Sequence, residues 1–437
     1  AVEVSEEPGV KLQGATIDGR KAHKRIKNLR KDWRYTAARF KGIDGKTYYV
    51  INKCGTYGIA SAQFWWGRMA GLLTRICLHS NLARWLLVYV DDVLALFRTD
   101  AAHDIWEQAA ARIMLLIVLG LPISWKKLDI GSTLDWIGHT IDLEMRRLRP
   151  TKAKNERVSQ FMKEIATGTY TTVTRLRQEL GATRFVTETL PHLTPFLQPL
   201  HSWVTGLLNS KMERPGGRPG ELHKVIANFI LHALDDLKEG VSSGSHMVHP
   251  PILQGSGGSD AKADQLEARI GGWWSTQVNP VKAECWWYSI DITKHRFPWA
   301  FDRVSPQRRI GALEMLATVM LSRLIGRTSG RGHTNVSARG ITDSQCNSFA
   351  ILRAYSRKQP TAALHMELAA TASEEGVWPR ISHTLRENNT WADQLTEKDF
   401  SGFCLGRRWR PCLHDTFFYV LDKLLNLLPG RGYGIDD

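Results

Sequence analysis

Seven acidic residues stand out because of the segments around them, and they form two groups along the chain. Two divalent ions roughly 3.5–4 Å apart can clamp the attacking and leaving oxygens of a phosphoryl transfer, and carboxylates from separate segments hold such ions. The sequence therefore predicts a two-metal site in each group. The first acidic group is Asp18, Asp91 and Asp92, and the second acidic group is Asp260, Glu314, Asp343 and Asp393.

The first acidic group requires two elements that meet on one sheet. Asp18 ends the short run ATID, and Asp91 and Asp92 interrupt the apolar, β-rich stretch WLLVYVDDVLALF at 85–97. Two such runs around a short polar break predict a hairpin that carries both carboxylates at its turn. Aspartate is also common in hairpin turns for backbone reasons alone, and this second interpretation stays open.

The second acidic group is spread over strands and helices. Asp260 lies in GGSDA, Glu314 lies on a predicted helix whose apolar positions share one face, and Asp343 ends the predicted strand VSARGITD. Asp393 follows Asn389 and Thr390, so stabilisation of a first-turn acid by the helix dipole is an alternative to metal binding. We also predict strands in GGWWSTQV and ECWWYSIDI, beside these acids.

Composition favours a folded nucleic-acid-binding protein. Lys and Arg number 58 against 43 Asp and Glu, a formal charge of +15, and hydrophobic residues make up 43%, which excludes intrinsic disorder. The segment 20–46 holds eleven Lys or Arg against two acids, with Trp33, Tyr35 and Phe40 interleaved. Basic and aromatic side chains together favour a template or primer surface, and a solvated basic face is the alternative.

No segment predicts a disulfide scaffold or a membrane span. The six cysteines include no CxxC pair, and the most apolar run, Ile113–Ile123, is about half as long as a membrane span. We therefore expect no membrane partner and an intracellular location, in cytoplasm or nucleus. The length of 437 residues gives a prior of about three domains.

YVDD between apolar strands resembles the polymerase signature of reverse transcriptases, and the surrounding segments resemble other blocks of that family in the same order. The segment that begins IDGRKAHKR resembles the motif with the first metal carboxylate, here Asp18. TYGIASAQF resembles the block that packs on template and nucleotide. LGLPISWKK resembles the block whose lysine lies near the triphosphate, and DWIGHTID resembles the primer grip.

This resemblance implies roles beyond the metal ligands. His23, Gln63 and Lys21 depart from the usual family residues, so nucleotide handling is expected to differ. Because 17 residues precede Asp18, we expect the fingers subdomain to be missing. The residues implied for nucleotide or template binding are His23, Tyr89, Gly58, Ser61, Lys126 and Lys127, and those for the primer grip are Trp136 and Gly138.

The second acidic group resembles an RNase H domain in the order and setting of its four acids. TDSQCNSFAIL resembles the strand-to-helix block of that family, and ISHTLRENNTWADQLT resembles the segment that leads to the last aspartate. The resemblance implies that the four acids bind two metal ions, and that His383 assists product release or proton transfer. Its alternative is a histidine at a strand end without chemistry. Lys262 departs from a common serine.

Together the matches resemble the reverse transcriptase and RNase H region of a retrotransposon, of gypsy, DIRS or trypanosomatid VIPER type. The expected fold class is α+β and α/β multidomain, a palm with a helical thumb or connection followed by an RNase H-like domain. The expected divisions are 1–148 (palm), 149–238 (mostly helical thumb or connection), 239–259 (linker), 260–403 (RNase H-like) and 404–437 (helical tail).

The predicted function is that of an RNA-directed DNA polymerase that also cleaves RNA in RNA–DNA hybrids. It would use two Mg²⁺ or Mn²⁺ ions per active site, with an RNA template, a DNA primer, the hybrid and dNTPs as partners. Two alternatives remain: an RNase H with a vestigial palm that only holds nucleic acid, and a non-enzymatic scaffold protein in a ribonucleoprotein.

Overall fold

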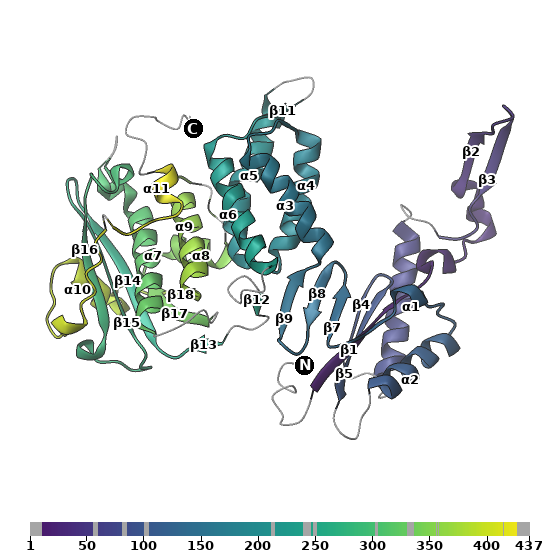
Figure 1. Cartoon of the computed structure of the whole chain (residues 1–437), viewed down its shortest axis with the longest axis horizontal. Coiled ribbons are helices and arrows are strands. Elements are labelled where there is room, and N and C mark those ends of the chain that lie inside the picture. Colours follow the sequence, from purple (N-terminus) through teal and green to yellow (C-terminus); the bar gives the residue numbers. More distant parts are fainter. Residues whose placement is uncertain are drawn as a thin grey trace. The chain divides into compact units, whose positions relative to one another are not determined.

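The computed structural model groups the chain into two compact units, Ala1–Thr151 and Lys152–Asp437 (Figure 1). Each unit combines helices with sheets, which confirms the predicted mixed α/β, multidomain class. Within the described ranges, no helix has both the length and the apolar composition to cross a membrane. The structure describes residues 11–55, 60–80, 85–99, 105–210, 215–238, 246–247, 251–301, 305–329, 336–354, 356, 358–413 and 415–425.

The first unit is built on an antiparallel sheet in the order β4-β5-β1-β6. Helices α1 and α2 pack on one face of this sheet, where Ile17, Val93 and Trp66 form part of the buried core. The predicted hairpin is confirmed, because β4 and β5 pair around a two-residue turn. The prediction that both acids lie in this turn needs a correction, because the turn is Val90–Asp91 and Asp92 is the first residue of β5. The elements are β1 (Lys11–Asp18), α1 (Ala60–His79), β4 (Trp85–Tyr89), β5 (Asp92–Thr99), α2 (Ile105–Val118) and β6 (Asp129–Gly131).

Two smaller antiparallel arrangements complete the first unit. The strands β7, β8 and β9 pair in that order, and the turn between β7 and β8 has positive φ angles at Ile137 and Gly138, as type I′ turns require. The other is the β2–β3 hairpin, which projects from the rest of this unit (Figure 1). The bounds are β2 (Ala37–Lys41), β3 (Thr47–Ile51), β7 (Thr133–Trp136), β8 (His139–Asp142) and β9 (Arg147–Pro150).

A five-strand core in the order β18-β17-β14-β15-β16 organises the second unit. Strands β14, β15 and β16 are antiparallel, whereas β17 pairs in parallel with both β14 and β18. Helix α7 packs on one face, and α10 packs on the other. The bounds are β14 (Ser256–Ala263), β15 (Ala268–Ser275), β16 (Trp286–Ile292), α7 (Ile310–Thr328), β17 (Val336–Thr342), α8 (Gln345–Arg353), α9 (Thr361–Glu375), β18 (Val377–His383) and α10 (Thr390–Thr396).

Four helices precede this sheet in the second unit, as the helical pattern of 150–237 predicts. Their buried side chains, such as Phe161 and Phe196, belong to the same apolar core as Leu316 of α7. The break predicted at 215–221 separates α5 from α6. The bounds are α3 (Lys152–Ala166), β10 (Thr171–Thr172), α4 (Val173–Thr187), α5 (Thr194–Asn209), β11 (Gly216–Gly217) and α6 (Glu221–Lys238).

The segment 239–259 needs a correction, because its end is part of the sheet. Strands β13 (Ile252–Leu253) and β14 begin inside it, in agreement with the prediction that a folded unit starts near 251. The short strand β12 (His246–Met247) also lies within it. The glycines that look like linker residues serve close packing, since a Cβ at Gly257 would lie 2.9 Å from Trp274 Cε3.

The predicted tail helix is also corrected. Among the described residues it covers only α11 (Leu421–Leu424), and the residues just before it are held in a turn against α9. There the fully buried Glu367 accepts backbone hydrogen bonds from Tyr419 (3.1 Å), Val420 (2.6 Å) and Leu421 (3.1 Å). A carboxylate therefore caps the start of this short helix, which amphipathic periodicity alone could not predict.

We expect Gly271→Ala to destabilise the second unit, because its Cβ would lie 2.8 Å from Leu395 Cβ on α10. Overpacking of this kind costs about 1–3 kcal/mol. Gly181→Ala is the matched control, since nothing lies within 4 Å of the new Cβ on α4 and alanine favours a helix. Denaturant unfolding should show a lower stability for the first variant and an equal or higher one for the second. Equal losses in both variants would contradict the close packing of α10 on β15.

Candidate active sites

The second unit brings three of its four predicted acids together. Strands β14 and β17 run in parallel with Gly258 opposite Ile341, so Asp260 and Asp343, each two residues further on, arrive at the same end of the sheet. Glu314 reaches this end from α7. Each of the three offers a carboxylate oxygen within 4.8 Å of the other two.

Burial and mutual repulsion dominate the electrostatics of this cluster. Asp260 is 6% exposed, and burial, followed by the charge of Asp343, raises its pKa to about 7 although the Ala261 amide donates a 2.7 Å hydrogen bond to it. Burial likewise raises the pKa of Glu314, against a hydrogen bond from Ser344 that lowers it. Asp260 and Glu314 therefore resist full ionisation unless a cation compensates them.

One oxygen of the cluster lacks a hydrogen-bond partner among the described residues. Asp343 Oδ1 is buried and makes no hydrogen bond, whereas Asn347 Nδ2 donates to Glu314 Oε2 at 3.3 Å and to the Gly311 carbonyl at 2.8 Å. A buried acceptor without a donor is costly, and a hard divalent cation prefers carboxylate oxygens. The residues therefore fit a divalent metal ion.

Asp393 and His383 flank the cluster without joining it. Asp393 stands in the first turn of α10, where Arg386 Nη2 bonds its Oδ1 at 2.9 Å. Its charge still contributes to the raised pKa of Asp260. His383 is exposed at the end of β18, opposite Thr342 in register and thus next to the strand end that carries Asp343.

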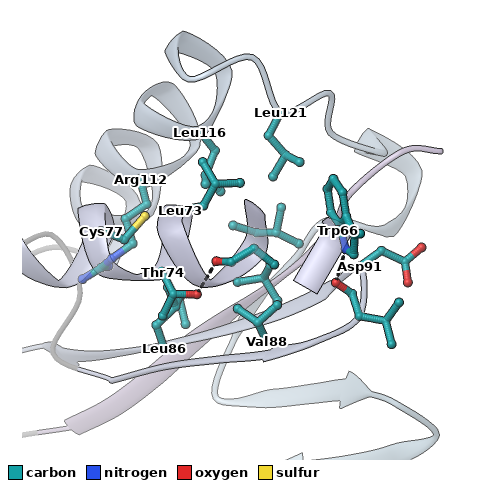
Figure 2. Close-up of a pocket in the computed structure, with 15 residues that line it drawn as sticks. Trp66, Leu73, Thr74, Cys77, Leu86, Val88, Asp91, Arg112, Leu116 and Leu121 are labelled. Carbon is teal, nitrogen blue, oxygen red and sulfur yellow. Dashed lines mark hydrogen bonds between the residues drawn. The ribbon is translucent and has the colours of Figure 1, made fainter. Parts of the chain in front are cut away.

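The first unit places Asp18 directly opposite Asp92. Their pairing ends the β1–β5 ladder, and Asp91 lies in the adjoining turn, whose backbone carbonyl accepts a 2.9 Å hydrogen bond from Gly19. Val90, the other turn residue, has a positive φ of 56°. Trp66 of α1, drawn beside Asp91 in Figure 2, donates a 2.5 Å hydrogen bond from its Nε1 to the Val90 carbonyl and so holds this strained residue.

The turn lies over an apolar pocket between the sheet and the two helices (Figure 2). Leu73, Val88 and Leu116 line it, and Cys77 and Arg112 lie further along. Burial lowers the pKa of Arg112 to about 10 and raises the pKa of the Cys77 thiol.

The position of Asp91 is fixed by its packing at this pocket and by the hydrogen bond from Gly19 to its backbone carbonyl, which leave its carboxylate for other contacts.

A lysine takes part in the first acidic group. Lys127 Nζ lies 2.9 Å from Asp18 Oδ1, and the segment before it is anchored by a hydrogen bond from the Ser124 amide to the Asp18 carbonyl. Burial, then Asp91 and Asp18, raises the pKa of Asp92, while Lys127 lowers it. Among the described residues, three acids with oxygens within 4.8 Å of one another occur in the second group. The carboxylates of the first group are therefore spaced more widely than those of the second.

The remaining predicted residues lie on separate elements of the first unit. Tyr89 is exposed on β4, Ser61 is exposed on α1, and Lys126 is exposed beside Lys127. Trp136 ends β7, and Gly138 occupies the following turn with a φ of 85°. His23 belongs to a 3₁₀ turn, but its side chain and Gly58 lie outside the described residues.

Sequence reasoning missed the groups that hold the acids in place. Asn347 and Arg386 each contact an acid of the second group, and Lys127, expected near a triphosphate, is bonded to Asp18. Asn347 stands four residues after Asp343 and Arg386 seven before Asp393, so spacing offered a weak signal for both. Nothing in the sequence marks Lys127 over Lys126 as the partner of Asp18.

Comparisons with known proteins give structural neighbours only. No family model and no curated protein matches the chain. It is similar to the foamy viral protease-reverse transcriptase dRH in complex with double-stranded DNA, at 15% identity and a TM-score of 0.41, over 85% of this chain and 57% of that one. The chain thus spans just over half of that neighbour.

Two further neighbours match about a third of the chain each. RNase H1 from the halophilic archaeon Halobacterium salinarum is 17% identical, with a TM-score of 0.24 over 33% of this chain and 96% of that one. Apo telomerase from Candida tropicalis, truncated from its C-terminal domain, is 10% identical, with a TM-score of 0.27 over 34% and 37%. At these identities, function rests on the geometry of the sites.

We expect Asp260→Asn to stabilise the metal-free protein at pH 8. The pKa of about 7 exceeds the unfolded value of about 3.9, so the ionised group destabilises the fold above pH 7, by up to about 4 kcal/mol, and this penalty fades as pH falls toward 4. Thermal unfolding with a chelator should give the variant a higher midpoint at pH 8 and a similar one near pH 4. The exposed Asp415→Asn is the control. If the variant's unfolding midpoint exceeded that of the parent by the same amount at low pH, ionisation of Asp260 would not be the cause of the gain.

Proposed function

We propose that this chain is a nucleic-acid-processing enzyme of the retroelement kind, in which the second unit cleaves RNA in RNA–DNA hybrids and the first unit is the palm of an RNA-directed DNA polymerase. The single observation that carries the proposal is the cluster of Asp260, Glu314 and Asp343, with oxygens within 4.8 Å of one another. A structural acid cluster would not leave Asp343 Oδ1 buried without a donor.

In the proposed ribonuclease site, Asp260, Glu314 and Asp343 hold two Mg²⁺ or Mn²⁺ ions. When bound, such ions activate a water molecule and stabilise the leaving oxygen of the cleaved phosphodiester. Asn347 fixes the Glu314 carboxylate through its 3.3 Å hydrogen bond. Asp393 would either leave its hydrogen bond with Arg386 and bind a metal ion, or keep that bond and remain beside the metal site. His383, exposed next to the cluster, would assist proton transfer or product release.

In the proposed polymerase site, Asp18 and Asp92 converge by strand pairing and Asp91 adjoins them. Lys127 neutralises Asp18 and would be displaced toward the triphosphate of a dNTP when divalent ions bind there. The exposed Lys126 and Tyr89 stand at the same end of the sheet and would contact nucleotide or template. Trp136 and Gly138, on the β7–β8 hairpin, would hold the primer.

The net charge of +15 supports RNA template, DNA primer and hybrid as partners, because Lys and Arg displace counterions from phosphates without reading sequence. The order of polymerase before ribonuclease along one chain supports a retrotransposon origin. An RNase H with a vestigial palm is the second candidate, favoured by the Lys127–Asp18 pair, which occupies a carboxylate that a polymerase needs for metal.

Asp343→Asn should reduce cleavage of RNA in a hybrid by more than roughly 100-fold, beyond the loss typical of outer partners of a metal site. Hybrid affinity should stay within about twofold, because the amide keeps the shape of the side chain while ligating a hard cation poorly. Cleavage of a labelled hybrid and its binding by fluorescence anisotropy measure the two effects. Asp415→Asn, exposed in the same unit, should cleave like the parent. Parental cleavage by Asp343→Asn would refute the ligand assignment.

Asp92→Asn should abolish extension of a DNA primer on an RNA template and leave hybrid cleavage unchanged, since the two acidic groups lie in different units. Extension assays with Mg²⁺ and with Mn²⁺, alongside cleavage by the same preparation, test this separation. Asp135→Asn, an exposed acid on β7, is the control. If the parent itself cleaves hybrids and extends no primer, the vestigial-palm candidate replaces the polymerase.

A further inference from the structure

The β2–β3 hairpin has no core of its own. Every residue of both strands is exposed, and the preceding 3₁₀ helix η3 (Arg30–Thr36) buries none of its side chains. A two-stranded hairpin is at best marginally stable in water. A projecting hairpin of this kind needs either a partner or a strong attachment at its base.

The base of the hairpin is firmly attached. Asn28 Nδ2 donates to the carbonyls of Asn52 (3.3 Å) and Cys54 (3.0 Å), and Thr36 Oγ1 donates to the Asn52 carbonyl at 2.7 Å. Trp33 Nε1 donates to the Asn28 carbonyl at 3.2 Å. These bonds join the chain segments on either side of the hairpin to each other and so close its base.

The strand register separates two faces with different chemistry. Residues paired directly across an antiparallel ladder share a face, and neighbours along a strand alternate. The ring centroids of Phe40 and Tyr48 lie 5.6 Å apart and stack on the first face, in agreement with this register. The apolar face consists of Ala38, Phe40, Tyr48 and Val50, and the basic face consists of Ala37, Arg39, Lys41, Thr47, Tyr49 and Ile51.

On the basic face, Arg39 is paired directly with Tyr49. Tyr49 is 70% exposed, so one side of its ring is open for stacking. A base stacked on Tyr49 would bring its phosphate within reach of the neighbouring guanidinium or of Lys41. This is the combination of ring and cation with which proteins hold single-stranded nucleic acid.

The charge of the whole segment favours nucleic acid over a protein partner. Residues 30–51 carry six Lys or Arg and two acids. One of these acids, Asp44, is used within the turn, where it accepts hydrogen bonds from Tyr48 Oη (2.7 Å) and the Lys46 amide (3.1 Å). On the apolar face, Phe40 and Tyr48 stack on each other, so part of their ring surface is already covered.

We propose that the basic face of the β2–β3 hairpin, centred on Arg39 and Tyr49, binds an unpaired strand of RNA or DNA. The inference rests on the proposed function, to which it adds a specific contact outside both acidic groups. Unpaired bases are required because a duplex does not offer its base faces to a tyrosine ring. Duplex affinity therefore depends little on Tyr49.

The test is fluorescence anisotropy of a labelled oligothymidylate of about 20 nucleotides, with the full chain and with a duplex of equal length as comparison. Tyr49→Ala should weaken oligothymidylate binding about tenfold, and Tyr49→Phe should bind within about twofold of the parent, because the ring is kept. Arg39→Ala should reduce the slope of log affinity against log salt by about one. Phe40→Ala, which removes a ring from the opposite face, is the matched control and should bind like the parent.

The proposal is overturned if Tyr49→Ala binds like the parent, or if Phe40→Ala loses as much affinity as Tyr49→Ala. It is also overturned if Phe40→Ala alone changes both the oligomeric state, measured by sedimentation, and binding, because the hairpin would then serve a protein partner. Far-UV circular dichroism establishes that the exposed substitutions leave the fold intact. Hybrid cleavage by the same variants reports separately on the proposed function, since Asp343 and the hairpin lie in different units.

Discussion

The parallel pairing of β14 with β17 is the constraint on which the second unit depends. It forces Asp260 and Asp343 to the same end of the sheet, where Glu314 from α7 completes a buried cluster of like charges. Such a cluster opposes folding when ionised, so the rest of the unit must hold it. The mostly apolar packing of α7 between the sheet and α9 provides that support, because it holds the helix that carries Glu314 against the sheet.

On the other face of this sheet, small residues allow α10 to pack closely. Gly258 and Gly271 leave room for α10, where Asn389 donates a 3.1 Å hydrogen bond to the Ser259 carbonyl beside Asp260. The side chain of its N-cap residue, Asn389, thus ties the helix that carries Asp393 to the backbone of the strand that carries Asp260. Arg386 then determines the resting direction of the Asp393 carboxylate, which explains why this acid stands outside the cluster.

Patterns that repeat along one element could be predicted, and contacts between distant residues could not. The apolar runs around Asp91 and the periodicity of α7 indicated the correct hairpin and helix, because local burial produces both patterns. The glycines and serines of 252–259 resemble a linker in composition, yet those from Ser256 onward belong to β14, where Trp274 and Asn389 leave space only for glycine at 257 and 258. In the candidate sites, residue types predicted that Asp260, Glu314 and Asp343 converge, but they did not predict that Asp393 pairs with Arg386 outside the cluster. The choice of Lys127 as the partner of Asp18 depends on how residues 122–127 are anchored.

The two acidic groups solve one electrostatic problem in opposite ways. In the second group, burial and the charge of Asp343 raise the pKa of Asp260 to about 7, so a proton competes with metal at neutral pH. In the first group, the ammonium group of Lys127 neutralises the charge of Asp18, a role that a proton has at Asp260 in the second group. A proton leaves the second site as pH rises, whereas the lysine stays charged throughout the physiological range. Metal loading should therefore depend on pH mainly in the second group, and on a movement of Lys127 in the first.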